Sequence, residues 1–281
     1  MRMNVREISL ADRDRVRAWT AHEASLDECA DGVITDDGES AVLWGDGMHP
    51  LTERWERQIV PLGERPIEDW HDLLKASLRS LPGDIGQVRV EIRRSAHEGA
   101  LGEALRAAGF VDQILRIRKN IDVPEEPGLP SGVAIRLLTD GEEQFAVHCV
   151  CLAITQALDA PVPAAHVRQF TRNWLDEGWS SGTLRSYVVV AHGDLVAHAL
   201  VSLDGTVGEL VDLVVPDAYQ RSNGWSRVLS AFVETRLACE GASQLGGTVV
   251  TPDGVRPDQL VASLSRSGWW IETVSMIRKS G

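Results

Sequence analysis

Hydrophobic and polar positions in the second half of the chain follow the periods of alternating helices and strands. The pattern predicts strands over 133–138, 185–191, 195–203, 208–215, 247–250 and 270–278, and helices over 142–155, 164–177, 224–240 and 258–265. Polar, glycine-containing turns separate the three central strands, as in hairpins. An antiparallel meander that passes into a strand, helix and strand crossover indicates a mixed α+β fold.

The first half of the chain opens and closes like the second. Residues 99–119 and 258–279 each read as an amphipathic helix, a glycine stop and an alternating strand that ends in Arg-Lys. Between the halves, residues 123–132 hold three prolines and two glycines, which interrupt both helices and strands. We therefore predict a diverged tandem repeat, with domains over 1–122 and 133–281 and a linker over 123–132.

The stretch from residue 208 to residue 242 carries the strongest chemical signal. It reads as a strand, a polar turn that contains glycine, and a long helix. The start of such a helix presents unpaired backbone N–H groups and the positive end of the helix dipole, which together attract a pyrophosphate. The turn lacks both the Gly-Lys-Ser/Thr of a P-loop and the three-glycine dinucleotide pattern. It favours a nucleotide-containing cofactor of another kind.

This turn resembles the pyrophosphate loop of the GNAT superfamily of acyl-CoA-dependent N-acyltransferases, which reads Arg/Gln-x-x-Gly-x-Gly/Ala. The matching residues are Arg221, Ser222, Asn223, Gly224, Trp225 and Ser226. The resemblance covers residues 133–279 and includes the order of elements, Val215-Pro216 after the fourth strand, and Gly268-Trp269 where the family commonly has Gly-Phe. It implies two tandem GNAT-like domains, each a mixed, mostly antiparallel sheet flanked by helices.

The resemblance also implies acetyl-CoA as the acyl donor. The backbone of Val214 and Val215 would pair with the pantetheine arm, and the amides of residues 221–226 would hold the pyrophosphate. Two departures stand out. The turn over 216–224 is about two residues longer than the commonest form, and Leu264 occupies the place where many members carry a tyrosine that protonates the leaving thiolate.

Acyl transfer to an amine requires a base, because an alkylamine with a pKa of about 10 is protonated at neutral pH. Glu209 matches the position where several superfamily members place a glutamate that acts through water. Strand alternation predicts that Glu209 shares a face with Val211 and Leu213, and that Asp212 lies on the opposite face. Asp212 and His198 are further candidates. The alternatives are a solvated Glu209, a salt-bridged Asp212 and a structural His198.

Composition narrows the choice of partners. The formal net charge of −13 argues against a nucleic-acid partner and permits a cationic substrate. The chain shows neither a secretory signal nor an apolar run long enough to span a membrane, so we expect a cytoplasmic protein without a membrane partner.

We interpret the four cysteines as reduced packing residues. We also expect no metal site, because the spacings of zinc and calcium sites are missing.

The residues and the resemblance together predict an N-acetyltransferase that moves an acetyl group directly to the primary amine of a small molecule, with a carboxylate base acting through water. The missing tyrosine keeps open a non-catalytic acyl-CoA-binding or scaffolding protein. An aminoacyl transferase that uses charged tRNA is disfavoured by the acidic charge. In the first half, Pro66 opens the helix that would face the cofactor and supplies no amide, so we expect that copy to keep the fold without the cofactor site.

Overall fold

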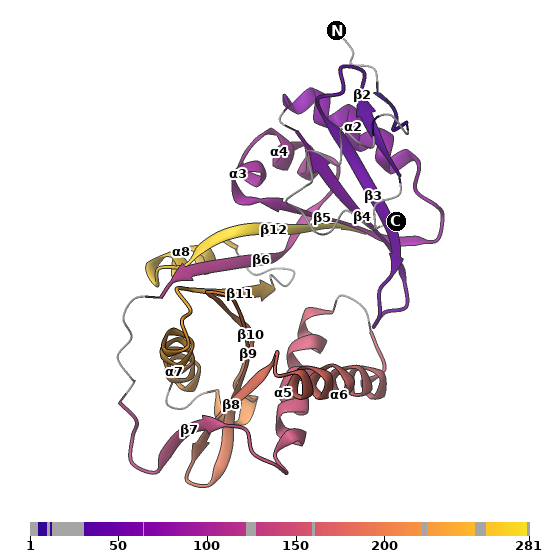
Figure 1. Ribbon diagram of the computed structural model, residues 1–281. Coiled ribbons are helices and arrows are strands. Elements are labelled where there is room, and N and C mark those ends of the chain that lie inside the picture. The colour runs from indigo at the N-terminus through magenta and orange to yellow at the C-terminus, as the bar shows by residue number, and fades with distance from the viewer. Residues whose placement is uncertain are drawn as a thin grey trace. The chain divides into compact units, whose positions relative to one another are not determined.

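The computed structural model describes residues 5–9, 12, 31–63, 65–121, 128–158, 161–220, 224–250 and 257–279 (Figure 1). Contacts divide the chain into two compact units. The first unit comprises Met1–Leu115 and Glu272–Gly281, and the second comprises Arg116–Ile271. The predicted boundaries place the last strand in the second domain, whereas its contacts group most of that strand with the first unit.

The first unit is a mixed sheet with three helices among its described residues. Strands β1 to β4 pair antiparallel in chain order, β4 pairs parallel with β5, and β12 pairs antiparallel with β5. The elements are β1 (Val5–Glu7), β2 (Asp31–Thr35), β3 (Ala41–Met48), β4 (Trp55–Leu62), α2 (Ile67–Arg79), β5 (Ile85–Arg93), α3 (Arg94–Glu98), α4 (Ala100–Ala107), the start of β6 (Val111–Asn120) and most of β12 (Trp270–Lys279).

The second unit repeats this plan. Strands β7 to β10 pair antiparallel in chain order, and β10 pairs parallel with β11. The elements are the end of β6, β7 (Val133–Leu137), α5 (Glu143–Ala157), α6 (Ala164–Ser181), β8 (Arg185–Ala191), β9 (Asp194–Asp204), β10 (Val207–Val214), the short 3-10 helix η2 (Asp217–Tyr219), α7 (Trp225–Cys239), β11 (Gln244–Val250) and α8 (Pro257–Arg266).

Helices cover both faces of the second unit's sheet, with α7 on one side and α5 and α6 on the other (Figure 1). On the first side, Leu229 and Val233 of α7 belong to one buried cluster with Ala199 of β9. On the other, Val150 of α5 belongs to a second buried cluster with Leu200 of β9. Consecutive strand residues point to opposite faces, so neighbouring β9 positions serve the two cores, which we call the α7 cluster and the α5–α6 cluster.

The predicted elements of the second unit all occur, with shifted ends. Helix α6 continues past the predicted end at 177 and stops at Gly182, whose positive φ closes the last turn. Strand β11 begins at Gln244 although Gly246 and Gly247 disfavour strand. A Cβ on Gly246 would lie 2.3 Å from the carboxylate oxygens of Glu209, so a neighbouring side chain occupies the space that the glycine leaves.

Candidate functional site

Strands β10 and β11 run side by side for only half of their length. Their parallel pairing extends from Val207, opposite Gln244, to Leu210, opposite Gly247. Beyond that point β10 continues to Val214 with β9 as its partner. Within the described part of the chain, no strand pairs with the other edge of β10 there. Peptide groups along this edge are therefore available to a ligand.

The parting of the two strands coincides with a β-bulge. Leu210 lies opposite Val201 on β9, and Asp212 lies opposite the next residue, Leu200, so Val211 is the extra residue. A bulge bends its strand and increases the local twist, which directs the end of β10 away from β11. The bulge is thus the local cause of the exposed strand edge.

The bulge overturns the predicted alternation. The sequence predicted one face for Glu209, Val211 and Leu213 and the opposite face for Asp212. In the structure Leu213 packs against the α7 cluster, whereas Val211 packs against the α5–α6 cluster. That prediction was wrong because one inserted residue inverts every later position of a strand.

Asp212 consequently shares a face with Glu209. Glu209 lies opposite Ser202 of β9, and Asp212 lies opposite Leu200, two positions away. Directly paired residues share a face, and residues two apart on a strand do so as well. Since Leu200 belongs to the α5–α6 cluster, both carboxylates lie on the face that α5 and α6 cover.

The carboxyl group of Asp212 is held in an apolar setting. Its Oδ2 atom is buried and has no hydrogen-bond partner among the described residues. Burial raises the pKa of Asp212 to about 7, although the backbone N–H of Leu213 opposes the shift. Burial also raises the pKa of Cys149, on α5, to about 12, and the charge of Asp212 adds to this shift. Asp212 can therefore both accept and release a proton near neutral pH.

The carboxylate of Glu209 lies beside a cation and is partly solvated, in agreement with the solvated alternative. Its carboxylate lies 3.6 Å from the guanidinium of Arg118 on β6, and 39% of its side chain is exposed. It also lies over Gly246, whose missing side chain leaves room for it. Glu209 is thus a partly solvated, cation-paired carboxylate. Arg118 precedes the linker, so no pattern within the second half of the sequence could indicate this partner.

His198 is completely buried on the same face of the sheet. Its Nε2 lies 3.0 Å from Ser186 Oγ, to which Trp179 Nε1 also donates at 3.2 Å. Burial lowers the pKa of His198 to about 4, so the ring is neutral at physiological pH. Neither Nδ1 of His198 nor Oδ2 of Asp212 has a hydrogen-bond partner among the described residues. The two residues are diagonal neighbours across the β9–β10 pair.

Helix α7 begins in an open turn. Gly224 is its N-cap in the left-handed region, at φ 62°, and a Cβ built there meets no described atom within 4 Å. No side chain of the described residues caps the helix, and its first turn holds no acidic residue. Ser226 is exposed, Trp225 is buried in the α7 cluster, and Val215 packs at the edge of that cluster. Such a helix start fits a pyrophosphate. Three predicted loop residues lie outside the described residues: Arg221, Ser222 and Asn223.

Neither described tyrosine replaces the one missing at Leu264, which lies half-buried on α8. Tyr187 is buried in the α7 cluster, with its ring 5.7 Å from that of Phe232, and burial raises its pKa. Tyr219, on η2, packs against the same cluster. These positions suit a packing role for both tyrosines.

Neither a disulfide nor a metal-ligand cluster occurs among the described residues. Three described cysteines are free thiols, and Cys29 lies outside the described residues. In the described ranges, no group of three or more His, Cys, Asp or Glu side chains is placed to hold a metal ion. None of the helices described here combines the length and apolarity needed to cross a membrane.

Comparison with known proteins identifies the fold. No protein-family model matches the chain, and no curated protein sequence matches it. Among solved structures, a GCN5-related N-acetyltransferase from Sphaerobacter thermophilus is 14% identical with a TM-score of 0.58, covering 99% of this chain and 95% of its own. One from Kribbella flavida is 14% identical with a TM-score of 0.54, covering 98% of this chain and 97% of its own.

A third solved structure bears on the repeat. It is a tandem GNAT protein from the clavulanic acid biosynthesis pathway, 14% identical with a TM-score of 0.51, and the match covers 100% of this chain and 99% of that protein. The predicted α+β class with two GNAT-like domains is confirmed. The chain has the tandem fold of the GCN5-related N-acetyltransferases.

Proposed function

We propose that this protein is an acetyl-CoA-dependent N-acetyltransferase whose second unit moves an acetyl group to the primary amine of a small molecule. The observation that carries the proposal is the bulge at Val211, which exposes one edge of β10 and places the buried carboxyl of Asp212 beside it. The shared fold with solved N-acetyltransferases supports acetyl transfer as the reaction class.

The donor would be held by backbone rather than by side chains. The peptide groups of β10 up to Val214, and that of Val215 after it, match the amide groups of a pantetheine arm. The first amides of α7, entered through Gly224, match a pyrophosphate. Residues 221–226 remain the predicted phosphate contacts. When bound, the thioester supplies an activated acetyl group.

Asp212 is the base that the geometry favours. The neutral amine attacks the thioester carbonyl carbon, a C–N bond forms, and the C–S bond breaks with its electron pair leaving on sulfur. The proton released from nitrogen passes to Asp212 through a water molecule, which His198 Nδ1 and Asp212 Oδ2 would hold as two unpartnered polar atoms of one face. A thiol has a reference pKa of about 8.5, so solvent suffices to protonate the thiolate.

Glu209 would have a different role. Its pairing with Arg118 stabilises the ionised form and leaves it partly solvated, which suits attraction of a cationic amine better than proton transfer. The net charge of −13 acts in the same direction. We therefore rank Asp212 ahead of Glu209, the reverse of the order that strand position alone favoured.

One observation supports a second candidate function. Leu264 occupies the place of the expected tyrosine, and both described tyrosines serve the α7 cluster. A protein that binds acyl-CoA without turning it over, as a sensor or a scaffold, would need no such acid.

The deciding experiment uses the full-length protein. Isothermal titration calorimetry with coenzyme A and acetyl-CoA measures binding, and thiol release from acetyl-CoA with a panel of primary amines measures turnover. Saturable binding with amine-dependent thiol release, lost in Asp212→Asn, supports the enzyme. Saturable binding with no release above hydrolysis supports the binding protein. Absence of binding overturns both.

A further inference from the structure

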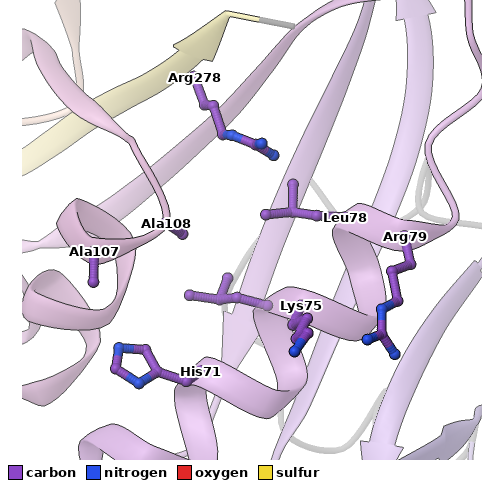
Figure 2. A pocket seen from close by; sticks show the side chains of 8 residues that line it. His71, Lys75, Leu78, Arg79, Ala107, Ala108 and Arg278 are labelled. Atoms are coloured by element: carbon purple, nitrogen blue, oxygen red, sulfur yellow. The ribbon is translucent and has the colours of Figure 1, made fainter. Parts of the chain in front are cut away.

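The first unit contains a hollow that no step of the proposed reaction uses. It has a volume of about 550 Å³ and lies between α2, the end of α4 and the end of β12 (Figure 2). Its lining consists of His71, Leu74, Lys75, Leu78, Arg79, Ala107, Ala108 and Arg278. The volume lies in the range that suits a small organic ligand.

The polar part of this lining is entirely basic. His71, Lys75 and Arg79 follow one another at four-residue spacing on α2, so they share one helical face. Arg278 reaches the same space from β12 (Figure 2). None of these four side chains has an ion pair or side-chain hydrogen bond to another described residue, and no acidic residue lines the hollow.

Several other basic residues of this unit are paired with carboxylates. Arg57 binds Asp46 with Nε 2.6 Å from the carboxylate, and Arg65 binds Asp37 at 2.5 Å. The chain as a whole carries an excess of 13 negative charges. Like charges four residues apart on a helix repel one another, so the pair Lys75 and Arg79 slightly disfavours the folded state unless an anion neutralises it. Local destabilisation of this kind is expected at functional sites.

The remaining lining is apolar. The side chain of Leu74 is 1% exposed and belongs to the core, and Leu78, Ala107 and Ala108 complete a non-polar surface. Basic groups beside an apolar floor suit a ligand with a charged end and a carbon body. A bare inorganic ion would leave the apolar floor unused.

We propose that this hollow binds a small organic anion with at least two negative charges, a phosphate ester or a polycarboxylate. Its charged group would lie among Lys75, Arg79 and Arg278, and its carbon body would lie on Leu74 and Leu78. The site is distinct from the start of α2, where Glu68 and Asp69 occupy the first turn. The inference does not depend on acyl transfer by the second unit.

The test is calorimetric titration of the full-length protein at pH 8 with phenyl phosphate, a dianionic phosphate ester, in one arm and citrate in the other. The double variant Lys75→Gln/Arg79→Gln and the single variant Arg278→Gln should each bind the preferred anion at least about tenfold more weakly, which is 1.4 kcal/mol. A stronger response to phenyl phosphate identifies the phosphate class, and a stronger response to citrate identifies the carboxylate class.

Two controls separate binding at the hollow from nonspecific attraction of anions and from binding at the start of α7. Arg168→Gln/Arg172→Gln removes the same charge at the same spacing on the exposed face of α6 and should leave binding within about twofold. Ser226→Asp disturbs the start of α7 and should leave binding at the hollow intact. Thermal unfolding without anion should show no loss of stability in the Lys75→Gln/Arg79→Gln variant, because repulsion is relieved. Absence of saturable binding of either anion, or equal losses in the α2 and α6 variants, overturns the proposal.

Discussion

Both units contain a strand, a turn and a helix that lead to a parallel strand, and the two turns differ in packing. In the first unit the turn after β4 is closed. Gly63 has φ 97°, and a Cβ there would lie 2.4 Å from Ser40 Oγ and 2.6 Å from the carbonyl oxygen of Glu39. Arg65 fixes the same turn through Ser40 and Asp37. In the second unit the turn ends at Gly224, whose missing Cβ would meet no described atom within 4 Å.

The strand before each turn and the helix after it also differ between the two units, and in each case the second unit is the more open to an anion. Helix α2 begins after Pro66 and has Glu68 and Asp69 in its first turn, whereas the first turn of α7 has no acidic residue. Strand β4 pairs with β3 in unbroken register, whereas β10 carries the bulge at Val211. The same strand, turn and helix order thus gives an acidic helix start in the first unit and a helix start without acidic residues in the second. In the proposed function, a few residues at the turn, and not the fold, decide whether this crossover suits an anion.

The largest expected effect concerns Asp212, the proposed base on the bulged strand. Asp212→Asn should lower kcat/KM by about 10²–10⁴-fold, the range for a general base. Because the ionised form is required, wild-type kcat/KM should rise with pH to a plateau with a midpoint near the pKa of about 7. Steady-state thiol release between pH 5.5 and 9 measures both quantities.

Glu209→Gln is the matched control, because it removes a carboxylate from the same face of β10. The β9 residues opposite Glu209 and Asp212 are two positions apart. We expect a loss below about tenfold with the pH midpoint retained. A loss equal to that of Asp212→Asn, together with a lost midpoint, would assign the base to Glu209.

The two glycines of the turns give the next largest effect. Gly63→Ala should reduce the free energy of unfolding by about 3 kcal/mol, because both a positive φ and a backbone contact oppose the new methyl group. Gly224→Ala should cost about 1 kcal/mol, because only the conformation opposes it. Urea denaturation measures both. Equal losses would show that the turn before α7 is as tightly packed as the one before α2.

Buried Asp212 also makes stability depend on pH. Its folded pKa of about 7 exceeds its unfolded value, so between about pH 4 and 7 the folded state binds more protons. This group therefore opposes folding increasingly as pH rises through that window. Asp212→Asn should gain about 2 kcal/mol relative to wild type on going from pH 5 to pH 8. Denaturation curves at pH 5 and pH 8 measure this difference. The same stability difference between Asp212→Asn and wild type at both pH values would show that the pKa of Asp212 is not raised by burial.

Deletion of Val211 should make β10 resemble β4. The deletion restores plain alternation while leaving Leu210 and Leu213 on the α7 face and Asp212 on the other. Folding should persist, and straightening of the strand should weaken acetyl-CoA binding by at least about tenfold, or 1.4 kcal/mol. Calorimetry and circular dichroism test this outcome. Unchanged affinity in a folded variant would remove the bulge from the binding account.

The smallest effect comes from giving α7 the acidic start of α2. Ser226→Asp places a negative charge beside the proposed pyrophosphate site and should weaken coenzyme A binding about fivefold, or about 1 kcal/mol. Ser226→Asn is the neutral control and should bind like wild type. Equal affinity of the aspartate variant would show that phosphate does not reach this end of the helix.

The sequence predicted the local elements well because hydrophobic period and turn glycines act over short distances. Helix α7 was predicted over 224–240 and extends over Trp225–Cys239. The alternating strand over 270–278 was predicted too. The pattern of hydrophobic residues does not determine which strand pairs with it. Met276 of β12 lies opposite Val90 of β5, in the first half of the chain. Such pairing depends on contacts far apart in sequence.

The order of elements, the repeat and the glycine turn into a long helix were determined by the sequence itself, because each rests on neighbours within a few positions. The face of Asp212 and its raised pKa were decided by tertiary structure. The bulge exists only as a register between β10 and β9, and α5 supplies the burial from about sixty residues earlier in the chain. The pKa of this carboxylate is raised by surroundings that its own strand does not encode.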